Sequence, residues 1–195
     1  MGASDPAQAI LDKLAGPTGV WEAGQTGAGG IQSGIVRGGN AEQADLATVR
    51  FVKHRSSERR HLYYVTFKGT IPQLGPVVHE FHYAYPVEPD AEGGWRVCGG
   101  SGGAGEMPRR STPWVNLGGG GWPKWFFAGG RIDPAGQPVD RVELRFQDGV
   151  TLHDDATDNI ALFISDHPPA MPATIVMLDP NDNEVVRHPA FPGVD

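Results

Sequence analysis

The stretch Gly118-Gly119-Gly120-Gly121-Trp122-Pro123-Lys124-Trp125-Phe126-Phe127 combines a glycine run with large apolar rings. It lies within residues 93–130, which hold 13 of the 28 glycines and four of the five tryptophans. A flexible linker is rich in glycine and serine and has no large apolar side chains. Rings of this size favour burial, whereas glycine permits tight turns and close approach of the backbone. The sequence therefore predicts an ordered central region and indicates no chemistry for it. Its rings either fill the junction between two lobes or are exposed and anchor a partner.

The segments on either side are typical of a mainly β protein. Ser4 or Asp5 can cap a short helix that has Pro6 in its first turn, and Gly16-Pro17 ends it. An antiparallel meander is expected next, with residues 24–39 as a loop or edge before it. Its strands are expected at residues 48–54, 61–67, 77–85 and 95–98, where apolar, aromatic and β-branched residues gather.

Short strands also dominate the C-terminal part of the chain. Asp148-Gly149 separates two alternating runs and predicts a hairpin. The almost wholly apolar residues 159–165 suit a strand that is buried on both faces, and further strands are expected at residues 174–178 and 184–188. The spacing predicts a β-sandwich. We divide the chain into a helix-plus-sheet lobe (1–105), a Gly/Trp-rich connecting segment (106–130) and a β-sandwich lobe (131–195).

This strand pattern carries two resemblances. The C-terminal half resembles the small Ig-like β-sandwich modules of many uncharacterised bacterial proteins, a likeness that implies no activity. The N-terminal order of one helix and four strands is similar to cystatin-like and NTF2-like folds. The overall fold class expected is α+β with a large excess of β: a short helix, an antiparallel meander and an Ig-like sandwich.

Composition excludes several classes of function. The net charge of −7 argues against general binding to nucleic acid. A single cysteine, Cys98, excludes an intramolecular disulfide, and we expect a small buried side chain there rather than a catalytic thiol. The start of the chain lacks a signal-peptide pattern and no apolar run is long enough to cross a membrane, so a cytoplasmic location is expected. No cofactor or metal motif is present.

Charged clusters are expected to be solvated. A basic group on the first hairpin is interpreted as a solvated surface or, alternatively, a contact for an acidic partner such as the acidic half of a second copy. An acidic loop near residue 155 misses the EF-hand pattern and is interpreted as a solvated turn. The basic group comprises Arg50, Lys53, Arg55, Arg59 and Arg60, with His54 and His61; the acidic loop comprises Asp154, Asp155 and Asp158.

Three functions remain open. The leading hypothesis is a non-enzymatic module that binds a protein partner, or a second copy of itself, through Trp114, Asn116, Trp122, Trp125, Phe126 and Phe127. The first alternative is an NTF2-like pocket, for a small molecule or for catalysis, lined by His79, Glu80, His82, Tyr83 and Tyr85. On a strand, His79, Tyr83 and Tyr85 share one face, whereas Glu80 and His82 share the other. The second alternative is a sandwich whose exposed tryptophans stack on carbohydrate.

Overall fold

A computed structural model describes residues 3–17, 20–26, 32–37, 40 and 42–191 of the 195-residue chain. Its first element is the helix α1 (Pro6–Leu14), which begins where the sequence predicts. The Asp5 carboxylate caps it by accepting a hydrogen bond of 2.8 Å from the amide of Gln8. Ala9, Ile10 and Leu14 are buried, so one face of this short helix packs against the protein.

The rest of the described chain is antiparallel β structure. β1 (Val20–Thr26) and β2 (Gln32–Arg37) pair with each other where a loop or edge was expected. A larger sheet has the order β3-β4-β5-β6, and β7 pairs with β5. Its strands are β3 (Gln43–Ser56), β4 (His61–Thr70), β5 (Val78–Pro89), β6 (Trp95–Val97) and β7 (Ser101–Ala104).

Two further sheets follow in the chain. One has the order β12-β9-β8 and the other has the order β11-β10-β13-β14. Their strands are β8 (Trp114–Gly120), β9 (Phe126–Asp133), β10 (Arg141–Phe146), β11 (Thr151–Asp155), β12 (Ile160–Ser165), β13 (Ala173–Leu178) and β14 (Glu184–Ala190). Strand pairing therefore places residues 114–120 and 126–130 in the β12-β9-β8 sheet, where the sequence suggested a connecting segment.

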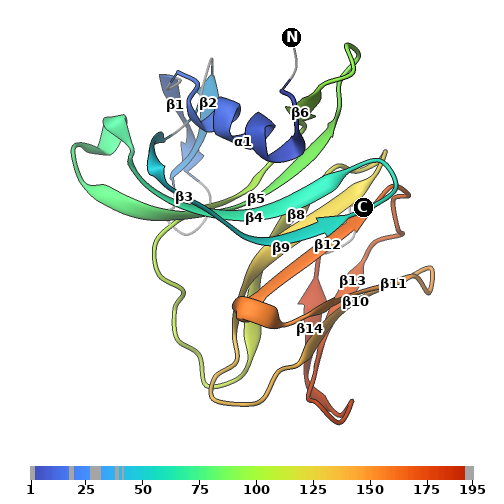
Figure 1. The fold of residues 1–195 in the computed structure, drawn as a ribbon. Helices are drawn as coiled ribbons and strands as arrows, with labels where there is room; N and C mark the ends of the chain where they lie inside the picture. The colour runs from blue at the N-terminus through green and yellow to red at the C-terminus, as the bar shows by residue number, and fades with distance from the viewer. Residues whose placement is uncertain (1–2, 18–19, 27–31, 38–39, 41, 192–195) are drawn as a thin grey trace.

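The elements stack in four layers (Figure 1). α1 covers one face of the β3-β4-β5-β6 sheet, where Ile10 and Leu14 meet Phe67 and Phe81. The other face of that sheet packs against β12-β9-β8. The opposite face of β12-β9-β8 packs against β11-β10-β13-β14. The sheet β12-β9-β8 thus lies between two others, and its strand β12 is buried on both faces from Ile160 to Phe163, as its apolar run predicts.

The glycines of the central region permit this close stacking. A Cβ atom on Gly129 would lie 2.6 Å from the Cβ of Ala84 in the neighbouring sheet and 2.8 Å from a methyl carbon of Leu162. A Cβ atom on Gly100 would lie 3.0 Å from the ring of Tyr85. The Gly129 contacts are tighter than side chains tolerate, so glycine is required where these two sheets approach, whereas a side chain at Gly100 would crowd the Tyr85 ring.

Candidate functional site

The predicted Gly/Trp surface is mostly core. Trp125, Phe126 and Phe127 are only 8%, 1% and 3% exposed. The Trp125 and Phe127 rings stack in the core between the β3-β4-β5-β6 sheet and the β12-β9-β8 sheet. The Arg60 guanidinium covers Trp125 at 4.5 Å from its ring centroid. Phe126 points to the other face of β9, into the core shared with the β11-β10-β13-β14 sheet. Of the two interpretations of this segment, these three side chains follow the buried one and do not form the expected binding surface. Phe126 and Phe127 point to opposite faces of β9, which lies between two sheets, and Trp125 packs just before that strand.

The other residues of that predicted surface lie apart from the buried rings. Trp122, in the turn between β8 and β9, is 47% exposed. Trp114 is half-buried beneath the guanidinium of Arg110, at 4.1 Å from its ring centroid. Asn116 is exposed on β8. Among these aromatic side chains, Trp122 is the one that remains as an exposed anchor.

The alternation expected on β5 is confirmed. Phe81 and Tyr85 pack towards α1, whereas Ala84 packs towards the β12-β9-β8 sheet. Tyr83 lies on the helix side and stacks on Tyr85, with ring centroids 5.1 Å apart and an interplanar angle of 8°. The five residues predicted to line one NTF2-like pocket therefore do not share one face of the sheet. Of the remaining members, Glu80 is exposed, His79 packs edge-on against Phe81, and His82 lies on the far side.

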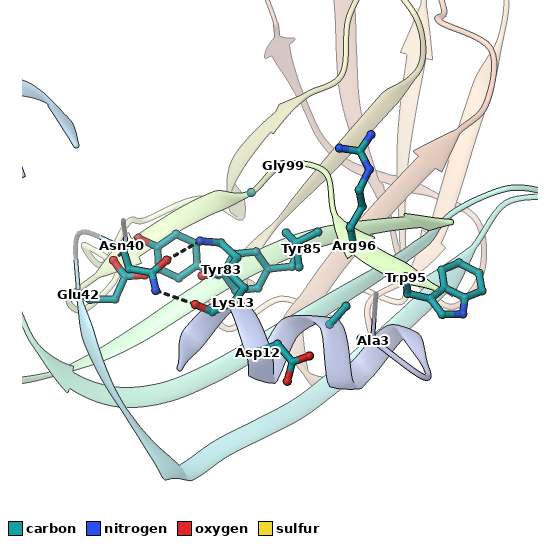
Figure 2. Close-up of a pocket in the computed structure, with 13 residues that line it drawn as sticks. Ala3, Asp12, Lys13, Asn40, Glu42, Tyr83, Tyr85, Trp95, Arg96 and Gly99 are labelled. Carbon is teal, nitrogen blue, oxygen red and sulfur yellow. Dashed lines mark hydrogen bonds between the residues drawn. The ribbon is translucent and has the colours of Figure 1, made fainter. Parts of the chain in front are cut away.

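The helix side of the sheet holds a pocket of about 710 Å³ (Figure 2). Tyr83 and Tyr85 contribute one wall, α1 contributes another, and the chain from Trp95 to Gly100 closes a third side. Lys13, Asn40 and Glu42 gather near the C-terminal end of α1, whereas Trp95 and Ala3 lie near its N-terminal end. A volume of this size falls in the range that binds small organic molecules.

Polar groups at the Lys13 end of the pocket are fixed by hydrogen bonds. The Lys13 ammonium donates to Asn40 Oδ1 at 2.7 Å, and Asn40 Nδ2 donates to the carbonyl of Lys13 at 2.7 Å. The Tyr83 hydroxyl donates to Glu42 Oε2 at 3.4 Å. Glu42 itself is only 4% exposed, which is rare for a carboxyl group. The side chains at this end therefore present a preorganised set of donors and acceptors.

Burial sets the protonation of these groups. Loss of solvation raises the pKa of Glu42 above its usual value, although the positive charge of Lys13 acts in the opposite direction. Burial also raises the pKa values of Tyr83 and Tyr85, and the nearby Glu42 carboxylate adds to both. Both tyrosines are consequently neutral hydrogen-bonding groups at physiological pH. The Tyr85 hydroxyl is buried and has no hydrogen-bond partner among the described residues.

No sequence pattern indicated Lys13, Asn40 or Glu42 as site residues. They belong to the helix end and the short segment before β3, far from β5 in the chain. A hydrophilic position at the end of an amphipathic helix and an acidic residue before a strand are common, so neither pattern indicated a pocket. Their proximity comes from the docking of α1 across the sheet.

The charged clusters also differ from expectation. Asp154 is fully buried, and its carboxylate binds the Lys53 ammonium at 2.8 Å and accepts from the amide of Leu162 at 2.7 Å. Arg55 pairs with both Asp154 and Asp155. Arg60 binds Asp166 at 2.8 Å. The basic hairpin and the acidic loop are therefore partners within one chain. The interpretation as solvated surface was wrong for Lys53, Arg60 and Asp154, which are largely buried, whereas Asp155 is exposed.

The described residues show little sign of metal or thiol chemistry. Across them, no group of three or more His, Cys, Asp or Glu side chains is arranged to hold a metal ion. The Cys98 thiol has its pKa raised to about 11, chiefly by burial and by the nearby Glu88 charge, which suits a neutral packed side chain. In the described part of the chain, no helix is long and apolar enough to cross a membrane.

Comparison of this chain with protein-family models, with curated proteins and with solved structures found no match.

Proposed function

We propose that this protein binds a small, uncharged organic molecule, a hydroxylated aromatic ring, in the pocket between α1 and β5. The observation that carries the proposal is the convergence of Glu42, Tyr83 and Tyr85 on a pocket of about 710 Å³. Large pockets lined by rings and a few fixed polar groups are the usual form of small-molecule sites. Buried titratable groups in such a pocket add support, because they cluster at functional sites.

The charges around the pocket favour an uncharged ligand. Its lining includes two basic residues, Lys13 and Arg96, and two acidic residues, Asp12 and Glu42. The formal charges of these four side chains cancel, so the pocket offers no excess of either sign. The Lys13 ammonium is already bound to Asn40, which leaves it less available to a ligand carboxylate.

The aromatic side chains favour a ring in the ligand. Tyr83 and Tyr85 form a stacked pair along one wall, and Trp95 lies at the other end of the pocket, held edge-on by His61 at a centroid distance of 5.0 Å. Flat side chains bury a planar ligand with little loss of entropy. The Tyr83 hydroxyl and the Glu42 carboxyl would then hydrogen-bond to hydroxyl groups on that ring.

Isothermal titration with resorcinol, benzoate and benzylamine tests this chemistry. We expect saturable binding of the neutral resorcinol and weaker binding of the anion and the cation. Tyr83→Phe and Glu42→Gln should each weaken resorcinol binding by about fivefold or more, since each loses a hydrogen bond. Lys124→Gln, in the β8–β9 turn, is the control and should leave binding unchanged. Tighter binding of either charged probe, or equal binding by all the variants, would refute the proposal.

The predicted protein-binding surface is the second candidate, on one observation. Trp122 is a large ring with 47% of its surface exposed on an irregular turn. Exposed tryptophans act as anchors at protein interfaces. Sedimentation of wild type and Trp122→Ala at high concentration tests self-association, the form of this candidate that needs no unknown partner. A dimer that the substitution abolishes would support it, and a monomer in both would count against it.

A further inference from the structure

A second cavity lies on the opposite face of the same sheet, between β4, β5 and β7 on one side and β8 and β9 on the other. Its volume is about 170 Å³, enough for several water molecules at about 30 Å³ each. Glycines form much of its wall, at Gly102, Gly103, Gly118, Gly129 and Gly130. Because glycine has no side chain, a space remains between the two sheets that larger side chains would fill.

Polar side chains face this glycine wall. The residues that line the cavity include Tyr64, His82, Ser101, Asn116 and Arg131. The Tyr64 and His82 rings are neighbours, with centroids 6.3 Å apart. The His82 Nδ1 atom is buried and has no hydrogen-bond partner among the described residues. A covered ring nitrogen without a partner is uncommon in a native protein and indicates that something else satisfies it.

We propose that this glycine-walled cavity is a binding site for a small oxyanion or carboxylate, held by Arg131, Tyr64 and His82. Arg131 is the one charged side chain among the described residues that line the cavity, so the lining carries a positive charge within an acidic protein. One of its terminal nitrogens donates to the carbonyl of Gly105 at 2.8 Å, which orients the guanidinium. Its other donors have no hydrogen-bond partner among the described residues. Glycine in strand interiors is typical of places where a ligand approaches the backbone.

The protonation of the cavity fits an anion. Burial raises the pKa of Tyr64 to about 12, against the lowering effect of Arg131, so the hydroxyl keeps its proton and can donate it. Burial and the Arg131 charge lower the pKa of His82, and Glu80 on the same strand opposes them weakly. Tyr64 faces His82 from β4 and Arg131 faces it from β9, whereas β7 and β8 present no titratable side chain to it. An anion beside Arg131 would offset that positive charge and favour the charged imidazole.

The site is separate from the proposed ligand pocket. His82 and Tyr64 point away from α1, whereas Tyr83 and Tyr85 point towards it, as the strand alternation requires. Loss of one site should therefore leave the other intact. Asn116 and Gly102 are exposed at the edge of the cavity, which gives an anion a route from solvent.

The test is the pKa of His82, measured by NMR of the histidine side chains with and without inorganic phosphate or acetate. The His82 signal is assigned from the spectrum of His82→Gln, and chloride at matched ionic strength is the reference. We expect at least one of the two anions to raise the His82 pKa saturably, by about one unit. No change with either anion up to about 50 mM would overturn the proposal and leave water as the occupant.

Substitution of the arginine separates a specific site from general screening. In Arg131→Gln, the pKa of His82 without added anion should rise, because a positive neighbour is lost, and the dependence on the anion should disappear. Arg50→Gln on β3 is the matched control, since Arg50 is exposed and does not line the cavity. An unchanged anion dependence in Arg131→Gln would also overturn the proposal. The wild-type titration against chloride decides the question even if the variant folds poorly.

Discussion

Tyr83 and Tyr85 carry the same side chain two residues apart, yet their hydroxyl groups have different surroundings. The Tyr83 hydroxyl donates to Glu42, whereas the Tyr85 hydroxyl is buried without a partner among the described residues. A buried polar group without a partner costs about 1–3 kcal/mol, because its hydrogen bond to water is lost on folding. The two residues therefore contribute differently to stability, although their rings stack on each other.

Tyr85→Phe should leave the free energy of unfolding unchanged or raise it by up to about 1 kcal/mol, since it removes an unpaired hydroxyl. Tyr83→Phe, its matched control, should lower it by about 1 kcal/mol through the lost hydrogen bond. Urea denaturation of both variants measures the difference. A loss of more than about 1 kcal/mol in Tyr85→Phe would show that its hydroxyl has a partner in solution.

Glu42 makes stability depend on pH. Its pKa is raised in the folded protein, so the folded state holds this proton more tightly than the unfolded state does. The stabilisation that this proton provides is complete below the unfolded pKa, near 4.5, and is lost as pH rises through the folded pKa. Glu42→Gln removes the titrating group. The stability of wild type relative to Glu42→Gln should therefore fall as pH rises above about 4.5.

Urea denaturation of the two proteins at several pH values measures this relative stability. Other titrating groups are common to both proteins and cancel in the comparison. A wild type that gains stability over Glu42→Gln with rising pH would mean that the attraction of Lys13 outweighs burial in setting the pKa of Glu42.

At the scale of elements, the glycine-rich strands β8 and β9 lie with β12 in a sheet between two other sheets. Gly129 faces both Ala84 and Leu162 at distances that exclude a methyl group, whereas a Cβ atom on Gly103 would meet no atom within 4 Å. The two glycines thus provide a matched pair, one at a close sheet–sheet contact and one in open space.

Gly129→Ala should lower the free energy of unfolding by about 1–3 kcal/mol, as over-packing of a dense core does. Gly103→Ala should change it by less than about 0.5 kcal/mol. Thermal or urea denaturation of both variants checks this contrast. Equal effects would mean that the two sheets are not in close contact at Gly129.

Much of this element structure could be predicted from the sequence, because strand alternation and turn residues are local signals. Asp148-Gly149 does separate β10 from β11, and the apolar run of β12 is doubly buried. Burial of the Gly/Trp stretch could not be predicted in the same way, because it depends on which sheets stack on each other, and stacking is not a local signal. No local pattern shows whether Trp125 meets solvent or Arg60. The same limit hid Glu42 and Lys13, which a docked helix brings to β5.

At the scale of the whole molecule, ion pairs join the two halves of the chain. Lys53 on β3 and Asp154 on β11 are 8% and 0% exposed at their side chains, and their charged atoms lie 2.8 Å apart. Lys53 also donates to the carbonyl of Ile160 at 2.8 Å. Removal of one member leaves the other buried and unpaired, which costs far more than the loss of an exposed pair.

Asp154→Ala should lower the free energy of unfolding by about 3–5 kcal/mol. The double variant Lys53→Met with Asp154→Leu should recover much of that loss, because it removes both charges. Asp158→Asn, in the same loop but exposed, is the control, because asparagine tolerates the positive φ of this position. Denaturation of the single and double variants measures the coupling between the two sites. Independent, additive losses would show that the two side chains do not interact across the layers.

The central claim is that ligand binding belongs to the helix-side pocket and not to the exposed turn at Trp122. The most direct test is fluorine NMR of protein labelled with 5-fluorotryptophan, titrated with resorcinol, with signals assigned by single Trp→Phe substitutions. Trp95 lines the pocket, whereas Trp122 lies on the β8–β9 turn. We predict a saturable shift of the Trp95 signal with no shift of the Trp122 signal. A shift of Trp122 without Trp95, or of neither, would contradict the account.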